Sequence, residues 1–221
     1  IYFIYFKDLF GMPYQFSLRF FILLLGLMCM ACGVVLSIRS DLGTSPISSL
    51  PYVYSFIVPL SVGTLTILMH VLMIITQQIL LGQNFTWTRW LQLPIGIIFG
   101  LGIDLLMWLT QTWQPNTYIE QLLYCLSSCA ITAVGVCMVV KANLVFLAGE
   151  GLYQAVAQRF RWDFGSCKLY GDIVLITLAL ISSYGFLQQI IGIREGTIIA
   201  AVLVGMLVKK ILPRLAFIQF K

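Results

Sequence analysis

Two stretches of the chain combine polar side chains with residues that break helices. The first offers one carboxylate and four hydroxyl groups, on Asp41, Thr44, Ser45, Ser48 and Ser49. Glycine and proline interrupt this stretch and leave backbone donors free, and a short helix starting near Pro46 would favour an anionic group at its N-terminus. We therefore expect this stretch to bind a small-molecule solute, and an ordinary surface loop with a Ser-Pro helix start is the alternative.

The second stretch holds Asn143 and the tripeptide Gly149-Glu150-Gly151. Glu150 lies between apolar residues, and a carboxylate at bilayer depth is costly unless it is paired or protonated. We expect Asn143 and Glu150 to contribute to the same solute site, with Glu150 also a candidate for proton coupling. Exposure of Glu150 at the membrane interface is the alternative.

Further ionisable residues lie within apolar helices. His70 and Asp172 occupy such positions, and Lys168 precedes Asp172 by four residues. Ionisable side chains inside spans usually face the bundle interior, so together with Glu150 these three are candidates for a proton-coupling or polar relay. An intrahelical ion pair between Lys168 and Asp172 is the structural alternative. Asp104 aligns loosely with Lys209, and a structural pair between them is a further hypothesis.

The elements that position these residues must be membrane helices. Of 221 residues, 60% are apolar and 10% are charged, whereas soluble domains have about 45–50% and about 25%. The mean hydropathy is +0.98. Charge-free runs cover residues 20–38, 42–88, 121–140 and 173–193, and about 20 apolar residues suffice to cross a bilayer as a helix. The sequence predicts an all-α, polytopic transmembrane bundle whose main partner is the lipid bilayer.

The uncharged runs divide into six expected spans, at 20–38, 64–81, 90–109, 121–140, 169–191 and 197–212. Residues 42–60 and 144–158 are rich in Gly, Pro and polar residues, so we expect two short, broken or re-entrant segments there. With six spans and a cytoplasmic N-terminus, basic residues divide 11 inside to 2 outside; with eight spans they divide 9 to 4. Six spans, with both termini in the cytoplasm, therefore fit the positive-inside rule better.

The chain also resembles itself at an offset of 102 positions. Gly33 then falls on Gly135, Asp41 on Asn143 and His70 on Asp172. The sequence thus predicts a first membrane repeat at 17–110, a polar connection at 111–119 and a second repeat at 120–214. Residues 1–16 and 215–221 are expected to be terminal segments outside the repeats, and Met12 is a plausible native start. Three spans per repeat would invert the second repeat, an architecture found in transporters.

Motifs for other functions are missing from the sequence. It has no Gly-x-Ser-x-Gly, no His-Glu-x-x-His and no phosphate loop. One histidine in the whole chain makes His-based metal catalysis improbable. We therefore expect no enzyme activity, no cofactor, no metal and no nucleic-acid partner.

Several of these residues also carry a resemblance to a family. Arg19, Gly26-Leu27 and Gly33, then residues 42–46 (Leu-Gly-Thr-Ser-Pro), resemble the bacterial YczE/YyaS/YitT family of integral membrane proteins. The segment 192–197 (Gly-Ile-Arg-Glu-Gly-Thr), followed by Ala200-Ala201 and Gly205, is similar to that family's closing motif. The resemblance implies a multi-pass protein of the bacterial cytoplasmic membrane, and it transfers no site residues.

Three hypotheses for function follow. The first is a small secondary transporter or permease for a small polar solute, bound where the two broken stretches meet. The second is the substrate-binding membrane subunit of an energy-coupled vitamin importer. The third is a non-transporting membrane protein that organises or regulates a partner enzyme, with a homodimer or a partner membrane protein as its assembly.

Overall fold

The computed structural model describes residues 13–215, and within that range the protein is helical and contains no β-strand. The α-helices are α2 (Pro13–Arg39), α3 (Pro46–Tyr54), α4 (Val62–Leu81), α5 (Gln92–Leu109), α6 (Tyr118–Ala142), α7 (Ala148–Phe160), α8 (Phe164–Leu187) and α9 (Glu195–Arg214). Two 3-10 turns, η1 (Gly82–Asn84) and η2 (Trp87–Leu91), connect α4 to α5. The expected terminal segments at 1–12 and 216–221 lie outside the described residues.

Six of these helices are long and apolar enough to cross a membrane. They are α2, α4, α5, α6, α8 and α9, and they correspond one to one to the six expected spans. The eight-span alternative is not supported, because α3 has 9 residues and α7 has 13. At 1.5 Å per residue these helices are about 14 and 20 Å long, so both are too short to span a bilayer core of about 30 Å.

The bounds of α8 differ at both ends from the sequence-based prediction of 169–191. The helix begins at Phe164 because the Asp163 carboxylate accepts the Ser166 backbone N–H at 3.1 Å, which caps the N-terminus. It ends at Leu187 because Gln188 adopts a left-handed conformation with φ of 54°. A capping side chain at the N-terminus and a left-handed backbone at the C-terminus, rather than the length of the apolar run, set the two ends.

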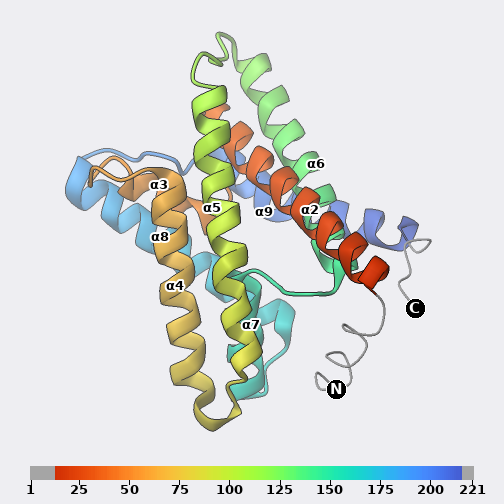
Figure 1. Ribbon diagram of the computed structural model, residues 1–221. Helices are drawn as coiled ribbons and strands as arrows, with labels where there is room; N and C mark the ends of the chain where they lie inside the picture. Colours follow the sequence, from red (N-terminus) through yellow and green to blue (C-terminus); the bar gives the residue numbers. More distant parts are fainter. Residues whose placement is uncertain (1–12, 216–221) are drawn as a thin grey trace.

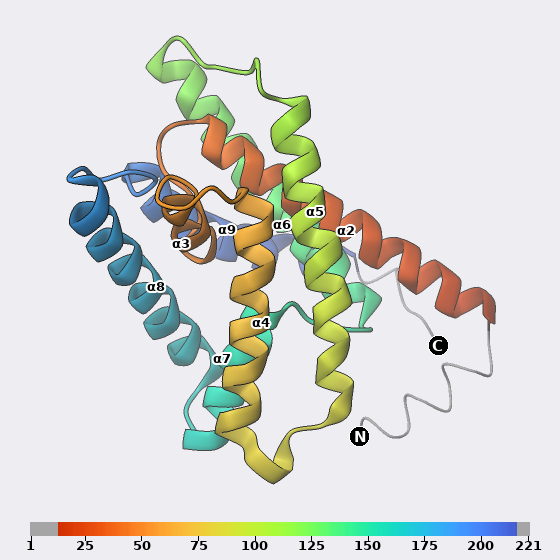
Figure 2. The same ribbon diagram turned by 60° about the vertical axis from the view of Figure 1, so that its left-hand side comes forward.

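The helices pack in crossed pairs (Figures 1 and 2). Helix α2 packs along α6, α5 packs on α2, and α9 packs on α6. The short helices pack across the two halves of the chain, α3 against α8 and α7 against α4. Helices α4 and α5 lie side by side as a hairpin in both views, whereas α8 and α9 do not pack closely on each other.

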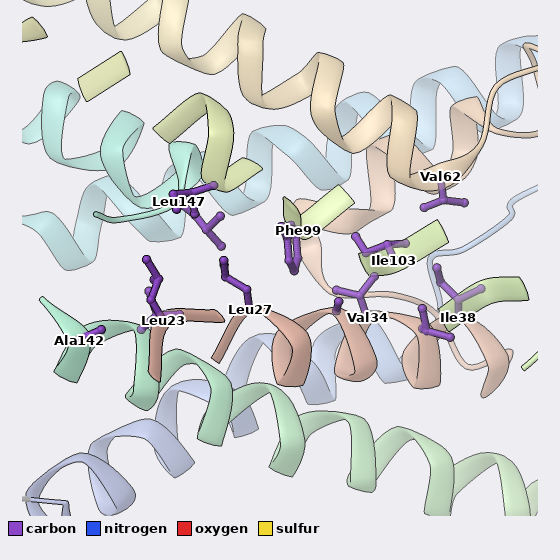
Figure 3. Close-up of a cluster of buried hydrophobic side chains, with 13 residues drawn as sticks. Leu23, Leu27, Val34, Ile38, Val62, Phe99, Ile103, Ala142 and Leu147 are labelled. Carbon is purple, nitrogen blue, oxygen red and sulfur yellow. The ribbon is translucent and has the colours of Figure 1, made fainter. Parts of the chain in front are cut away.

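The largest hydrophobic core lies where α2 meets α5, α6 and the segment before α7 (Figure 3). Leu23, Leu27, Phe99 and Ile103 are almost completely buried there. Leu147, the residue before α7, reaches the same cluster. This core therefore holds the start of a short helix against the long helices.

Glycines allow α2 and α6 to approach closely. A Cβ atom on Gly26 would lie 2.9 Å from the Gly135 carbonyl oxygen, and one on Gly135 would lie 2.7 Å from the Gly26 oxygen. Gly33 faces the Ser128 carbonyl oxygen at a similar distance. Small residues permit this kind of backbone contact between membrane helices.

Two of the connections between spans lie at one end of the bundle. The Arg39 guanidinium, at the end of α2, donates to the Met107 carbonyl oxygen at 2.8 Å and to the Thr110 hydroxyl at 3.3 Å. Thr44, just after α2, donates its backbone N–H to the Gly192 carbonyl oxygen at 2.9 Å. The α5–α6 and α8–α9 connections therefore both lie at the end where α2 finishes (Figure 2).

Candidate functional site

The first broken stretch is bound to the α8–α9 connection. In addition to its backbone N–H, Thr44 donates its hydroxyl to the Gly192 oxygen at 3.2 Å, and the Gly196 N–H donates to the Leu42 oxygen at 2.7 Å. Gly43 has φ of +105°, and a Cβ atom there would lie 2.5 Å from Thr197 Oγ1. Only glycine allows the two segments to lie this close.

Asp41 lies at the surface of this contact. It adopts a left-handed conformation with φ of 55°, and its side chain is 77% exposed. Arg194 donates to the Asp41 carbonyl oxygen at 2.9 Å, and its guanidinium lies 3.7 Å from the carboxylate. An exposed ion pair of this kind contributes little to stability, so the backbone hydrogen bond is the firmer part of the contact.

The serines of the first stretch bind one another at the start of α3. The Ser45 and Ser48 hydroxyls lie 3.0 Å apart, and Ser49 donates its hydroxyl to the Ser45 carbonyl oxygen at 2.9 Å. Ser48 and Ser49 are buried. Most of these hydroxyl groups are therefore used within the turn that starts the helix.

Asn143 ends α6. Its φ of 49° is left-handed, and its backbone N–H donates to the Val139 oxygen, as in a helix C-cap. The side chain is exposed and makes no hydrogen bond with the described residues. Asn143 therefore has an evident role in terminating the helix.

The first turn of α7 is bound by polar side chains from the α4–α5 hairpin. Gln77 donates its amide to the Ala148 carbonyl oxygen at 3.1 Å, and Arg89 donates to the Gly151 oxygen at 3.3 Å. Arg89 also donates to Gln77 Oε1 at 3.0 Å, and Gln77 donates to Gln92 at 2.9 Å. Gln77 and Gln92 are buried, so the network lies inside the bundle.

Glu150 lies in the same turn. Its Oε2 atom is buried and accepts no hydrogen bond from the described residues. Burial raises the pKa of the Glu150 carboxyl, and the positive charge of Lys168 acts in the opposite direction. A buried carboxyl oxygen without a donor can accept a hydrogen bond from a solute or hold a proton.

Beside Glu150, α7 is connected to α8 by three polar side chains. Tyr153 donates its hydroxyl to Asp172 at 2.7 Å, and the Lys168 ammonium lies 3.2 Å from the other Asp172 oxygen. The same ammonium lies 5.4 Å above the Tyr153 ring. The intrahelical pair of Lys168 and Asp172, which was the structural alternative to a polar relay, is therefore present, and Tyr153 extends it to α7.

His70 lies in an apolar environment. It is buried, its ring stacks on Phe99 at 5.9 Å between centroids, and Nδ1 has no hydrogen-bond partner. A Cβ atom on Gly96 would lie 2.6 Å from that nitrogen. His70 thus faces α5, and none of its contacts named here joins it to Asp172 or Glu150.

Asp104 binds the N-terminus of α4 instead of pairing with Lys209. Its carboxylate accepts the Gly63 backbone N–H at 2.8 Å and the Ser61 hydroxyl. The N-terminus of a helix carries partial positive charge and free N–H groups, which makes it a suitable partner for a carboxylate. The hypothesis of a pair with Lys209 was wrong.

The two broken stretches meet through apolar atoms. The Ile47 side chain lies directly on Gly149, where a Cβ atom would be 2.3 Å from the Ile47 Cδ1 atom. Leu50, Ala148 and Leu152 belong to the same hydrophobic cluster. The polar groups therefore lie on either side of this contact and not within it.

Four residues of these networks were not predicted from the sequence as site residues: Gln77, Arg89, Gln92 and Tyr153. Gln77 gave a usable signal, because it interrupts an otherwise apolar span. Among the residues that the structure describes, no group of three His, Cys, Asp or Glu side chains lies close enough to hold a metal ion.

Comparison with known proteins gives one match. Residues 17–213 match the DUF6198 family, which is described as a family of unknown function. No curated protein and no solved structure matches the chain.

Proposed function

The chain belongs to the DUF6198 family, and we propose that it is a small secondary transporter for a small polar solute. The observation that carries the proposal is the buried, unpartnered Glu150 carboxyl oxygen between two polar networks. Six apolar helices indicate an integral membrane protein, and ionisable groups buried in such proteins commonly mark a solute or ion pathway. We place the solute site around Glu150 in the first turn of α7.

The inverted repeat is part of this proposal, and element positions support it. Helices α3 and α7 begin at Pro46 and Ala148, and α4 and α8 begin at Val62 and Phe164, in both cases 102 positions apart. The left-handed residues Asp41 and Asn143 share the same offset.

The contacts between helices also correspond between the two halves, if α2, α3, α4 and α5 are matched with α6, α7, α8 and α9. The α2–α5 contact then corresponds to α6–α9, the α3–α8 contact to α7–α4, and the α3–α4 contact to α7–α8. Only the close packing of α4 on α5 has no equally close counterpart between α8 and α9. A two-fold relation between the halves would produce this pattern.

The direction of α2 and α6 favours inversion. Gly26 meets Gly135, while Gly33 meets Ser128, so the two helices run antiparallel. A two-fold axis that exchanges antiparallel helices is perpendicular to them, and for helices that cross a membrane it lies in the membrane plane. Transporters with inverted repeats have an axis of this kind.

Two arginine contacts are candidates for gates. Arg89 and Arg194 precede the last helix of each half, and each binds the broken stretch of the other half. The first clasp joins Arg194 to Asp41. The second clasp joins Gln77 to the Ala148 carbonyl group and Arg89 to the Gly151 carbonyl group, and Gln92 is bound to Gln77. Opening the clasps in turn would give Glu150 access to one side of the membrane and then the other.

Uptake by proteoliposomes tests the proposal. Solutes found by a thermal-shift screen of amino acids, nucleosides and water-soluble vitamins would be offered in radiolabelled form, with pyranine inside the vesicles to report proton movement. Glu150→Gln is expected to abolish uptake, whereas Glu120→Gln, at the third position of α6, is expected to leave it unchanged. Asp41→Asn is expected to reduce uptake only in part, since Arg194 also binds the Asp41 backbone. Full uptake by the Glu150→Gln variant would remove Glu150 from the mechanism.

A second candidate function follows from the surface of α8 and α9. Only 11% and 17% of their apolar windows are buried, against 39–56% in the other four candidate spans. Such a face suits a partner membrane protein or a second copy of the chain, as in an importer subunit or an organiser of an enzyme. Cross-linking from α8 to one stable protein, such as an ATPase pair, without solute-dependent stabilisation would favour this function.

The location also belongs to the proposal. Arg39 and Arg194 lie at the end where α2 finishes, and most other cations lie toward the opposite helix ends, including Arg89, Lys141, Arg159 and Arg161. The positive-inside rule then places both termini in the cytoplasm. With the resemblance to the YczE/YyaS/YitT family, this supports a bacterial cytoplasmic membrane protein.

A further inference from the structure

A small cavity lies beside the first broken stretch, between α2, α6 and α9. Its volume of about 20 Å³ leaves room for one water-sized occupant. Nine residues line it, and four of them bear hydroxyl groups: Ser37 of α2, Ser45 before α3, and Ser128 and Thr132 of α6. The other five, which include Val34, Ala200 and Val204, have no side-chain oxygen. The four hydroxyl groups are separate from the Glu150 region.

The hydrogen atoms of two of these hydroxyls are already donated. Ser37 donates to the Gly43 carbonyl oxygen at 3.0 Å, and Ser128 donates to the Cys125 carbonyl oxygen at 2.7 Å. Carbonyl groups can only accept, so the direction of both bonds is fixed. The Ser37 and Ser128 oxygens are left with lone pairs, which are acceptors and possible ligands.

Thr132 completes the cavity wall. Its hydroxyl makes no hydrogen bond with the described residues and lies on Gly33, where even a Cβ atom would overlap it at 1.9 Å. The glycine therefore leaves room for this oxygen.

The corresponding positions of the other half hold no hydroxyl groups. At the offset of 102, Ser37 corresponds to Val139, Ser45 to Leu147, Ser128 to Gly26 and Thr132 to Met30. Val139, Leu147 and Met30 all belong to the main hydrophobic core. Helices pack in the same way at the corresponding positions with apolar side chains. Packing alone therefore does not explain the four hydroxyl groups.

We propose that this cavity binds one sodium ion. Hard cations prefer oxygen ligands, and the Ser37 and Ser128 oxygens keep lone pairs because their protons are donated to carbonyl groups. The lining has no carboxylate, which disfavours the divalent ions Ca²⁺ and Mg²⁺. An anion would need donors, whereas Ser37 and Ser128 donate to carbonyl groups and Ser45 donates to the Ser48 hydroxyl, so only Thr132 has an uncommitted proton. As a coupling site the cavity rests on the proposed transport function, whereas Na⁺ binding itself does not.

Binding at this cavity would act on the first clasp. Ser45 is the residue before α3, and Ser37 binds Gly43, which itself lies against Thr197 and the Arg194 backbone. An ion held by α2, α6 and Ser45 would therefore favour the arrangement in which the first stretch lies on the α8–α9 connection. In this way the ion would bias one gate of the transporter.

Thermal unfolding of the full chain in detergent tests the site. Sodium chloride, potassium chloride and choline chloride would be compared at equal ionic strength by tryptophan fluorescence. Because a ligand that binds only the folded state stabilises it, Na⁺ is expected to raise the Tm saturably, with K⁺ at least tenfold weaker and choline without effect. Equal Tm values in the three salts would overturn the proposal and leave the cavity as a water site.

Matched variants locate the effect. Thr132→Val and Ser37→Ala are expected to raise the half-saturating Na⁺ concentration at least tenfold, whereas Thr132→Ser keeps the hydroxyl and the response. Thr66→Val is the control, because Thr66 is also buried and donates to a carbonyl group, but on α4. An unchanged Na⁺ response in Thr132→Val and Ser37→Ala would contradict this location. A Na⁺ response in a protein that transports no solute would contradict the transport function and support the site.

Discussion

The burial of Glu150 predicts how pH affects the stability of the protein. Its burial raises the pKa of the carboxyl in the folded protein above the ordinary value of 4.5. As the pH rises above that value the unfolded chain releases this proton first, so the folded state loses stability. Glu150→Gln has no proton to lose. In detergent, its Tm is expected to equal that of the wild type near pH 4 and to exceed it increasingly as the pH rises from 5, until the folded carboxyl is also ionised.

Glu120→Gln is the matched control for this titration. Glu120 is also the third residue of its helix, but it lies beside the polar α5–α6 connection, where its carboxylate accepts the Asn116 N–H. The Tm of this variant is compared with that of the wild type over the same pH range. A Glu150→Gln variant that is less stable than the wild type at pH 8 would contradict the burial argument.

The backbone conformation and close contacts of Gly43 give a second prediction for a single residue. Gly43→Ala would combine a positive φ with a clash against Thr197 and the Arg194 backbone, and it is expected to destabilise the protein by about 1–3 kcal/mol. Gly82→Ala, also at positive φ but with no atom within 4 Å, isolates the cost of φ alone. Chemical unfolding of both variants measures the difference, and equal losses would rule out the close approach.

The predictions for individual residues had different outcomes. The Lys168–Asp172 pair was confirmed, because four residues along a helix bring side chains together without help from the rest of the fold. Glu150 stays a prediction, supported by its buried oxygen. Gln77 and Arg89 were missed since their partners are carbonyl groups of α7, and no side-chain pattern encodes a contact with a distant backbone.

At the scale of elements, the sequence predicts the spans well because the length of an apolar run determines whether a helix can cross a bilayer. It also predicts that α3 and α7 are short, since Gly and Pro interrupt those runs. The exact ends were less predictable. Polar capping, as by Asp163 and Gln188 in α8, depends on local backbone geometry.

The two clasps predict an effect of cross-linking. In a cysteine-free background, cysteine pairs at 41 and 194, or at 77 and 148, would be joined by a short bifunctional thiol reagent. Each cross-link is expected to reduce uptake by at least tenfold, because each holds one broken stretch on the other half. Cleaving the linker is expected to restore uptake.

A pair at 61 and 104 provides the control for these cross-links. Ser61 and Asp104 are hydrogen-bonded within the α4–α5 hairpin, which would move as one body. Uptake that continues with either clasp cross-linked would contradict the alternating role of that clasp.

At the scale of the whole molecule, topology provides a further prediction. Cysteines introduced at 116 and 193 lie at the end of the bundle where α2 finishes, and those at 83 and 161 lie toward the opposite end. In intact cells, a membrane-impermeant maleimide is expected to label 116 and 193 but to reach 83 and 161 only after permeabilisation. Labelling of 116 and 193 from different sides would disprove the six-span inverted arrangement.

The offset of 102 positions was predictable from the sequence, because Gly33 and Gly135, and likewise Asp41 and Asn143, are separated by it. The differences in packing between the two halves were not predictable. The hairpin of α4 and α5 is close, while α8 and α9 diverge, and both pairs have similarly apolar sequences. Such packing depends on shape complementarity along whole helices, and residue spacing does not encode it.

The exchange of short helices between halves has a consequence for biosynthesis. Thr44 hydrogen-bonds to a carbonyl group 148 residues later, and α3 packs on α8. When α3 leaves the ribosome, its packing partner α8 has not yet been translated. Nascent α3 must therefore remain in the translocon or the lipid, with the unpaired backbone groups of the first broken stretch exposed. A message cut short before α8 would therefore yield a product that membrane proteases degrade, and the two halves would have to be produced together to assemble.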